Sequence, residues 1–312
     1  MTVGHTGTPH VFDGRAQPPE AIPVWAMLAT PFGSTGDIDH ASLRRYAKEV
    51  IRRGCAAVVV LGVIGEPGAL TPGERMAVVE TAVASGVEVY VGVLAATHAE
   101  RLAEVSSISA QFGDHVAGYL VPVTTPDPTE LRDEITELSA AGARAILLQD
   151  YPASSGTHIE VDDLARAVSG LPWVAGIKCE AAPTFARIRR LRELVPSIAL
   201  MSGLGGLGLV EDLSQGARLV AAGTSRPEVV VAAVRAWREG DDARARRIVG
   251  ASASMAGFEI QQGTSIAIRK EHWRRQGVIA SSAVRPPAMP YEPYLSPLSE
   301  AHGFPDPALL KD

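Results

Sequence analysis

Eight short apolar segments, each followed by an amphipathic segment, constrain the possible fold of this chain more than any other feature. The apolar segments are nearly continuous, which is typical of parallel strands that are buried on both faces. They span residues 24–31, 55–61, 88–94, 116–121, 144–150, 173–179, 197–202 and 218–222. The helical patterns that follow them span residues 40–53, 72–85, 98–112, 128–141, 160–169, 183–194, 206–215 and 227–238. Eight alternating βα units predict a closed (β/α)8 TIM barrel, with an open doubly wound sheet as the alternative.

Local signals support several of these helix ends. Thr71-Pro72 with Glu74 is a typical helix start, because the threonine can cap the first turn and proline fits its first position. Glycines occur where four of the helices should end, since glycine adopts the left-handed conformation of a C-terminal cap. These glycines are Gly54, Gly86, Gly113 and Gly142.

The rest of the chain divides around the predicted barrel. Residues 1–22 are polar, contain Gly and Pro, and are expected to form an N-terminal arm before a barrel over residues 23–239. Residues 240–277 predict additional C-terminal helices packed on the barrel, ending in a basic stretch that begins at Arg269. Residues 278–312 are Pro-rich and predict an extended tail on the surface or on a neighbouring subunit.

Charge and composition exclude several classes of protein. A net charge of −6 disfavours a nucleic-acid-binding protein, because phosphate binding needs clustered Lys and Arg. No apolar run approaches the roughly 20 residues that cross a bilayer, and the N-terminus lacks the pattern of a secretion signal. Cys55 and Cys179 both lie in apolar segments, so a disulfide framework is not expected. We therefore expect a cytoplasmic protein that binds neither nucleic acid nor membrane.

Lys178 is the most informative candidate for catalysis. Active sites of these barrels lie at the C-terminal ends of the strands, and Lys178 stands near the end of the sixth apolar segment. Only four of the 29 basic residues are lysines, so the chain generally uses Arg where it needs a positive charge. Burial favours a neutral amine that can attack a ketone, whereas a guanidinium stays protonated. The alternative is a lysine that extends from the strand end to solvent or pairs with an acid.

Three polar residues could act with Lys178. Glu180 lies two positions later, so a strand would place it on the same side, as an ion-pair partner, a general acid/base or a solvent-facing residue. Gln149 and Tyr151 stand at the end of the fifth apolar segment and share parity, so one of them should face the barrel mouth.

Short loops after other strands are candidates for binding a substrate. In the segment from Gly62 to Glu66, which includes Val63 and Ile64, backbone N–H groups could cradle a carboxylate, although a plain βα turn also uses glycines. Further predicted substrate contacts lie at or after the ends of the fourth, seventh and eighth strands, and they are Thr124, Gly203 and Ala221. The glycines between Gly203 and Gly208 could cradle a phosphate or simply allow close packing.

No motif indicates a metal or a dissociable cofactor. The eight histidines are scattered without His-x-His or His-Glu-x-x-His spacing, so the ligands of a metal-dependent aldolase are missing. No phosphate-binding loop of the Walker type and no Gly-x-Gly-x-x-Gly motif stands at a strand–helix junction. We therefore expect a site without metal and without cofactor.

Taken together and in this order, the motifs resemble those of the dihydrodipicolinate synthase/N-acetylneuraminate lyase family of class I aldolases. The resemblance runs from about Val24 to Trp273. It includes Ala-Thr-Pro-Phe at 29–32 with Gly-Asp-Ile-Asp at 36–39, and Gly-Val-Ile-Gly-Glu at 62–66 where the family has Gly-Thr-Thr-Gly-Glu. It also includes Leu-Thr at 70–71, Glu-Arg at 74–75, Gly-Ile-Lys at 176–178 and Ser-Gly at 202–203.

The resemblance implies a TIM barrel in which Lys178 forms a covalent Schiff base with pyruvate or a related 2-oxo acid. The protonated imine would act as an electron sink, so that a neighbouring C–C bond breaks or forms without metal. Backbone N–H groups near Val63 and Ile64 would hold the substrate carboxylate. The resemblance also implies a homo-oligomer, either a tetramer or a dimer.

Several positions depart from the family pattern. Val63 and Ile64 replace two threonines of a proton relay, and the paired tyrosines after the fourth strand correspond to Val123 and Thr124. The catalytic tyrosine of the fifth strand corresponds to Gln149, and the arginine after it corresponds to a serine at 154. These departures argue against a lysine-pathway enzyme and favour a divergent subgroup with Gln-Asp-Tyr-Pro and Lys-x-Glu motifs. Proton transfer would then fall to Tyr151, Glu180 or bound water.

Two other functions remain open at this point. One is a Schiff-base dehydratase or hydratase of a 2-oxo acid, which shares the lysine but breaks a different bond. The other is a barrel without catalytic activity that serves as a binding or regulatory protein, which the missing tyrosine and threonines would explain.

Overall fold

A computed structural model describes residues 21–302 of the chain. Most of the expected N-terminal arm and the last ten residues of the expected tail therefore lie outside the described residues. Among the described residues, no helix is long and apolar enough to span a bilayer.

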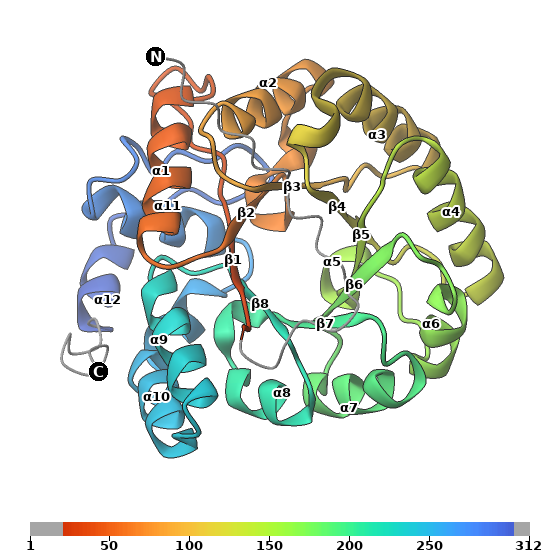
Figure 1. Cartoon of the computed structure of the whole chain (residues 1–312). Coiled ribbons are helices and arrows are strands. Elements are labelled where there is room, and N and C mark those ends of the chain that lie inside the picture. Colours follow the sequence, from red (N-terminus) through yellow and green to blue (C-terminus); the bar gives the residue numbers. More distant parts are fainter. Residues whose placement is uncertain (1–20, 303–312) are drawn as a thin grey trace, which may run out of the picture.

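Eight parallel strands close into a barrel, as the alternating pattern predicts (Figure 1). They are β1 Val24–Met27, β2 Ala57–Val60, β3 Val89–Gly92, β4 Gly118–Pro122, β5 Ile146–Asp150, β6 Val174–Cys179, β7 Ala199–Ser202 and β8 Leu219–Ala222. Pairing of β1 with β8 completes the ring, with Trp25 opposite Ala221. The prediction of a (β/α)8 TIM barrel is confirmed, and the open doubly wound sheet is wrong.

A ring of helices surrounds the barrel, and their bounds agree closely with the predicted segments (Figure 1). They are α1 His40–Arg52, α2 Pro72–Val83, α3 His98–Phe112, α4 Pro128–Ala140, α6 Val161–Val168, α7 Thr184–Leu194, α8 Leu209–Gln215 and α9 Pro227–Arg238. Thr71 and Glu74 form a reciprocal capping box at the start of α2. The four glycines expected at helix ends all have positive φ, between 48° and 116°.

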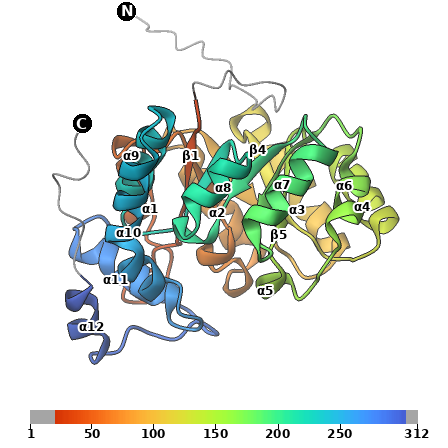
Figure 2. The ribbon, with the colours of Figure 1, turned by 90° about the horizontal axis from the view of Figure 1, so that it is seen from below.

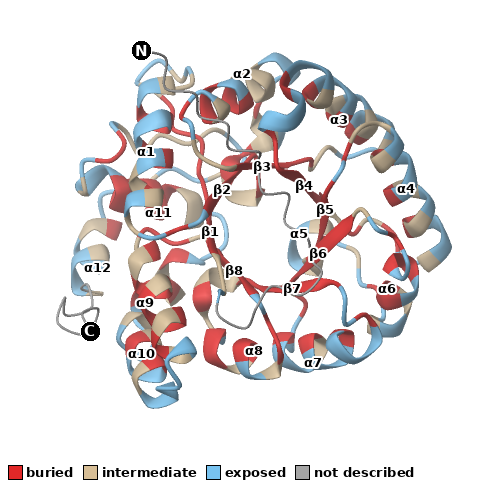
Figure 3. Cartoon of the chain, in the orientation of Figure 1, coloured by how far each residue is buried: buried red, intermediate tan, exposed pale blue. Residues whose placement is uncertain are grey.

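Burial separates the core into two layers, and in Figure 3 the strands are coloured almost entirely as buried. The larger layer lies between the strands and the helices, because alternate strand residues point outward to the helical ring. The smaller layer fills the interior of the barrel and includes Trp25 stacked on Tyr90, with 3.8 Å between their ring centroids. The interior of the barrel is therefore a packed core.

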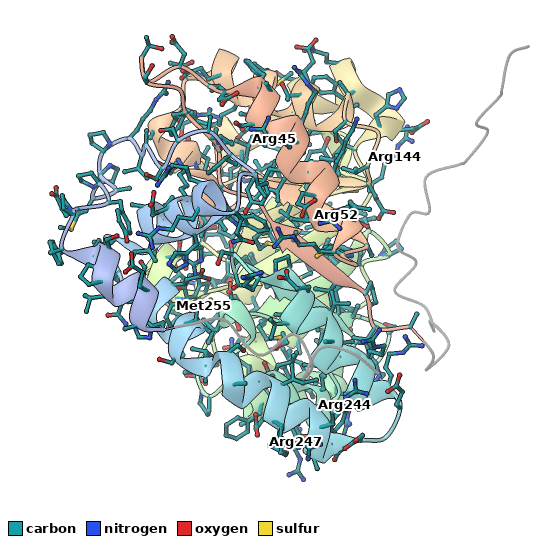
Figure 4. All side chains as sticks on the ribbon, turned by 90° about the vertical axis from the view of Figure 1, so that its left-hand side faces the viewer. Arg45, Arg52, Arg144, Arg244, Arg247 and Met255 are labelled. Carbon is teal, nitrogen blue, oxygen red and sulfur yellow. The ribbon has the colours of Figure 1, made fainter. Side chains whose placement is uncertain are left out.

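Three further helices follow the barrel: α10 Asp242–Glu259, α11 Ser265–Arg275 and α12 Leu295–Ala301. They lie together on one side, and Figure 2 places α11 and α12 toward the same end of the barrel as the short helix α5 Pro152–Ser155. Arg45, labelled on α1 in Figure 4, donates from Nε to the carbonyl oxygen of Val278 (2.6 Å) and so anchors this region to the barrel. The tail was expected to be extended, but Leu295 is buried and begins a helix.

Candidate active site

A cavity of about 440 Å³ opens at the C-terminal ends of the strands. Its walls come from the ends of six strands or the loops after them, from the segment that joins α10 to α11, and from α11 itself. Eight of the ten predicted site residues line it. These are Gly62, Val63, Ile64, Gln149, Tyr151, Lys178, Glu180 and Ala221. Side chains that the sequence analysis did not predict complete the wall, among them Met27, Gln262 and Arg269.

Lys178 lies at the inner end of this cavity, on β6. The two flanking residues, Ile177 and Cys179, pack outward in the layer under the helices, so strand alternation turns Lys178 into the barrel. Its side chain is only 8% exposed. The Nζ atom lies 3.1 Å from Oε2 of Glu180 and 4.0 Å from Sδ of Met27. The amine is thus held inside the cavity by one carboxylate and one soft, apolar neighbour.

Three groups fix the Glu180 carboxylate. Besides Lys178, the Nε2 of Gln149 donates to Oε2 (2.9 Å) and the backbone N–H of Leu204 donates to Oε1 (3.2 Å). Gln149 occupies the position opposite Lys178 in the pairing of β5 with β6, so its amide reaches Glu180 from the neighbouring strand. The carboxylate therefore connects Lys178 to β5 and to the loop after β7.

Gly203 makes room for this carboxylate and does not itself line the cavity. A Cβ atom at residue 203 would lie 2.5 Å from Cγ and 2.6 Å from Oε1 of Glu180. Such distances are not tolerated, so the absence of a side chain at 203 is a condition for the position of Glu180. Gly203 was predicted to contact the substrate. In the structure it packs against Glu180, which in turn lines the cavity.

Tyr151 lines the cavity and carries a phenolic hydroxyl group. Burial raises the pKa of this phenol, the negative charge of Glu180 raises it further, and the positive charge of Arg269 opposes both effects. The Tyr151 hydroxyl is therefore protonated at neutral pH and can donate a proton or a hydrogen bond. The short helix α5 begins immediately after it, with the N–H groups of Ser154 and Ser155 donating to the Tyr151 carbonyl oxygen.

The loop after β2 contains two 3-10 turns, and the first of them, Val63–Gly65, lies between two residues with left-handed backbone. Leu61 has φ 57° and Glu66 has φ 56°, which places both in a backbone region that residues other than glycine rarely adopt. Thr30 supports the turn by donating from Oγ1 to the carbonyl oxygen of Gly65 (2.7 Å). As the first N–H groups of a helical turn, those of Val63 and Ile64 have no acceptor within it.

A buried ion pair fastens this turn to the C-terminal region. The Lys270 ammonium donates to Glu66 Oε2, and the backbone N–H of Arg285 donates to Glu66 Oε1 (2.9 Å). Lys270 also lies over the ring of Phe32, 4.2 Å from its centroid. Burial lowers the pKa of Lys270 to about 8, although Glu66 acts in the opposite direction. The conformation of the turn therefore depends on residues far away in the sequence.

Thr124 does not reach the cavity, which corrects its predicted position. After β4 the chain turns outward, and Oγ1 of Thr124 donates to Oε2 of Glu134 on α4 (2.8 Å). The same carboxylate accepts a hydrogen bond from Arg101 on α3 (3.1 Å). Thr124 thus contributes to a contact between two outer helices. The described residues that line the cavity include none from β3, from β4 or from the loops that follow these strands.

Arg269 is the principal residue that sequence reasoning missed. It stood out only as the start of a basic stretch, because its position beside the cavity depends on how α11 docks against the barrel. No group of three or more His, Cys, Asp or Glu side chains within residues 21–302 could hold a metal ion. Three charged residues in this range line the cavity: Lys178, Glu180 and Arg269.

Comparison with known proteins agrees with this architecture. A model of the dihydrodipicolinate synthetase family matches residues 22–297. The crystal structure of dihydrodipicolinate synthase from Rhodopseudomonas palustris superimposes with a TM-score of 0.82 at 24% identity, covering 92% of this chain and 98% of that one. Proteus mirabilis N-acetylneuraminate lyase superimposes with a TM-score of 0.80 at 18% identity, covering 91% and 97%. These two likenesses show a shared fold.

Curated relatives carry names of more than one enzyme. The L-2-keto-3-deoxyarabonate dehydratase of Azospirillum brasilense is 29% identical over 279 residues, which covers 85% of this chain and 87% of that protein. A 4-hydroxy-tetrahydrodipicolinate synthase of Salinibacter ruber is 30% identical over 155 residues, so this chain spans about half (51%) of its length. The fold is that of an aldolase-type lyase, and the chain belongs to the dihydrodipicolinate synthetase family.

Proposed function

We propose that this protein is a lyase that forms a Schiff base between Lys178 and pyruvate or a related 2-oxo acid, and then breaks or makes a C–C bond. The observation that carries the proposal is the position of the Lys178 amine, buried at the inner end of a cavity and 3.1 Å from the carboxylate of Glu180. An amine that is placed beside a proton acceptor and shielded from bulk water is suited to attack a ketone.

The first step needs a neutral amine. Glu180 accepts a proton from the Lys178 ammonium, and the amine nitrogen then attacks C2 of the 2-oxo acid. The resulting carbinolamine loses its hydroxyl group as water, with a proton from Tyr151 or from Glu180, and leaves a protonated imine. Throughout, the carboxylate of the substrate rests on the N–H groups of Val63 and Ile64.

The imine then serves as an electron sink. In the cleavage direction, a base removes the proton of a hydroxyl group on C4, the C3–C4 bond breaks, and its electron pair moves toward the imine nitrogen as an enamine forms. Protonation of C3 and hydrolysis of the imine release the 2-oxo acid and restore the lysine. Tyr151, Glu180 or a bound water supplies these protons, because Gln149 cannot donate a proton as a tyrosine would.

Borohydride reduction in the presence of pyruvate tests the proposal. We expect mass spectrometry to find a reduced pyruvyl group on Lys178, and to find none in Lys178→Met. Lys48→Met is the matched control, because Lys48 is exposed on α1, outside the cavity. Unmodified Lys178 under conditions that trap a known Schiff-base aldolase would contradict the proposal. Stabilisation by ligand without trapping or turnover would indicate a binding protein instead.

A second candidate is dehydration of a 2-oxo acid. It is favoured by the dehydratase of Azospirillum brasilense, to which this chain is similar over most of both lengths. The imine would form in the same way, but a base would then remove a proton from C3, and the enamine would expel the C4 hydroxyl group as water. Product analysis separates the two: cleavage yields a shorter 2-oxo acid and an aldehyde, whereas dehydration retains the whole carbon skeleton.

We also propose that the protein assembles as a homo-oligomer, either a dimer or a tetramer, as the family resemblance implies. Light scattering coupled to size-exclusion chromatography would measure the mass directly, and a mass equal to one chain would contradict this proposal.

A further inference from the structure

Arg269 enters the cavity from outside the barrel. It belongs to α11, whereas Lys178, Glu180 and Tyr151 come from the strands or the loops that follow them. The residue is 6% exposed, yet it is part of the cavity wall. A guanidinium in such a position has lost most of its hydration, so it needs other partners.

The protein gives Arg269 only neutral partners. Its Nε donates to the carbonyl oxygen of Gly223, and its Nη1 donates to that of Ser265 (3.3 Å). Among residues 21–302, no carboxylate lies within ion-pair distance of this guanidinium, and its Nη2 has no acceptor. A guanidinium carries five N–H donors, so three of them are left for a ligand.

The nearest candidate counter-ion inside the protein is already engaged. Glu259 is completely buried and influences the ionisation of Arg269. Its Oε2 accepts hydrogen bonds from Thr224 (2.9 Å) and from the backbone of Ser225 (3.1 Å), and its Oε1 accepts from His272 (2.7 Å). Glu259 and Glu180 thus compensate Arg269 only through space, and neither carboxylate accepts a hydrogen bond from its guanidinium.

The location of Arg269 relative to Lys178 indicates which part of a substrate it would meet. Lys178 lies at the inner end, and the turn Val63–Gly65 forms one wall. The segment from Ile260 to Arg269 forms the part of the wall outside the barrel. A volume of about 440 Å³ falls in the range of roughly 300–1,000 Å³ typical of pockets that enclose a whole small ligand. Pyruvate alone would leave much of this space, including the side of Arg269, unused.

We propose that Arg269 binds a second carboxylate at the far end of the substrate, which makes this enzyme selective for 2-oxo dicarboxylic acids. The inference rests on the proposed function, because the imine at Lys178 fixes one end of the substrate. A carboxylate matches the planar guanidinium with two parallel hydrogen bonds and supplies a negative charge in direct contact with it. Gln262 and Ser265, which line the same part of the cavity, add polar groups around it.

Matched pairs of substrates test this in the wild-type protein. 2-Oxoglutarate is compared with 5-methyl-2-oxohexanoate, and 2-oxoadipate with 6-methyl-2-oxoheptanoate, so that two methyl groups replace two carboxylate oxygens. The readout is the concentration that gives half-maximal borohydride trapping on Lys178. We expect one of the two dicarboxylates to require an at least tenfold lower concentration than its neutral partner. Equal concentrations for both pairs would overturn the proposal.

Substitution of the arginine provides the second arm. In Arg269→Met the preference should fall to about one. In Arg274→Met, an exposed arginine on the same helix that pairs with Glu271, the preference should remain. A preference that survives Arg269→Met would overturn the proposal. Should that variant fail to fold, the wild-type comparison still decides the question.

A ligand without a ketone separates failure of this inference from failure of the proposed function. Glutarate has two carboxylates but cannot form an imine, so its binding measured by calorimetry is independent of Lys178 chemistry. We expect wild-type protein to bind glutarate at least tenfold more tightly than Arg269→Met does. No pyruvate adduct on Lys178, together with Arg269-dependent binding of glutarate, would refute the Schiff base and retain the anion site. Pyruvate trapping with no Arg269-dependent binding or preference would refute the anion site alone.

Discussion

Replacing Gly203 with alanine should displace Glu180 while leaving the barrel intact. The added Cβ would lie 2.5 Å from Cγ of Glu180, whereas non-bonded carbons need about 3.5–4.0 Å. The carboxylate arm must therefore move by about 1 Å or more. Such a shift takes Oε1 out of hydrogen-bond range of the Leu204 N–H, now 3.2 Å away, and Oε2 out of range of Lys178, now 3.1 Å away.

The size of the effect follows from these contacts. A hydrogen bond to a charged group contributes about 1.5–3 kcal/mol, and about 1.4 kcal/mol corresponds to a factor of ten in rate. If Glu180 accepts the proton of Lys178, the rate of imine formation in Gly203→Ala should fall by roughly 10- to 100-fold. The free energy of unfolding should change by only about 1 kcal/mol, because alanine restricts the unfolded chain and offsets part of the clash.

The assay is the rate of borohydride trapping at a pyruvate concentration well below saturation, with thermal unfolding measured in parallel. Gly73→Ala is the matched control, because a Cβ at that position of α2 meets nothing within 4 Å. A Gly203→Ala protein that unfolds like wild type and also traps pyruvate at the wild-type rate would refute the assigned role of Glu180.

Three further predictions concern buried groups. Glu66→Gln should lower the free energy of unfolding by about 3 kcal/mol at pH 7, measured by urea titration. The substitution leaves the Lys270 ammonium, whose side chain is 0% exposed, without its carboxylate. A change below about 1 kcal/mol would contradict this. The folded protein releases the Lys270 proton near pH 8 and the unfolded chain near pH 10.5, so the unfolded state binds more protons between these values. The free energy of unfolding should therefore rise with pH in this range, by up to about 1.4 kcal/mol per pH unit relative to the double variant Glu66→Gln/Lys270→Met. A difference in free energy between the two proteins that stays flat or falls with pH would contradict this. Burial raises the pKa of Cys55 to about 12 and that of Cys179 well above its usual value, so neither thiol should react with a disulfide reagent at pH 8 until the protein is unfolded, and fast labelling of native protein would be the contrary result.

The barrel was predictable because its signals are local. Each strand is a short apolar run, and each helix carries its own periodicity and its own cap, so the order of elements follows from the sequence alone. The same alternation within β6 predicts that Lys178 and Glu180 share a side, and their side chains lie 3.1 Å apart. Helix α5 was missed because four residues are too few to show a period.

Features that depend on tertiary docking were not predictable in this way. The sequence placed Thr124 after a strand but could not reveal that its hydroxyl turns outward to Glu134. Nor could it place Arg269 beside the cavity, since this requires the first part of α11 to pack against the rim of the barrel. The Pro-rich composition of the tail concealed α12, which forms where the buried Leu295 packs.

The link between Glu66 and the backbone of Arg285 joins positions 219 residues apart. At a synthesis rate of about 5–20 residues per second, the ribosome needs on the order of 10 to 40 s to proceed from one to the other. During that interval the early βα units can pair, but the turn after β2 still lacks its permanent support. The turn after β2, which forms one wall of the cavity, therefore gains this support only after residue 285 has been synthesised.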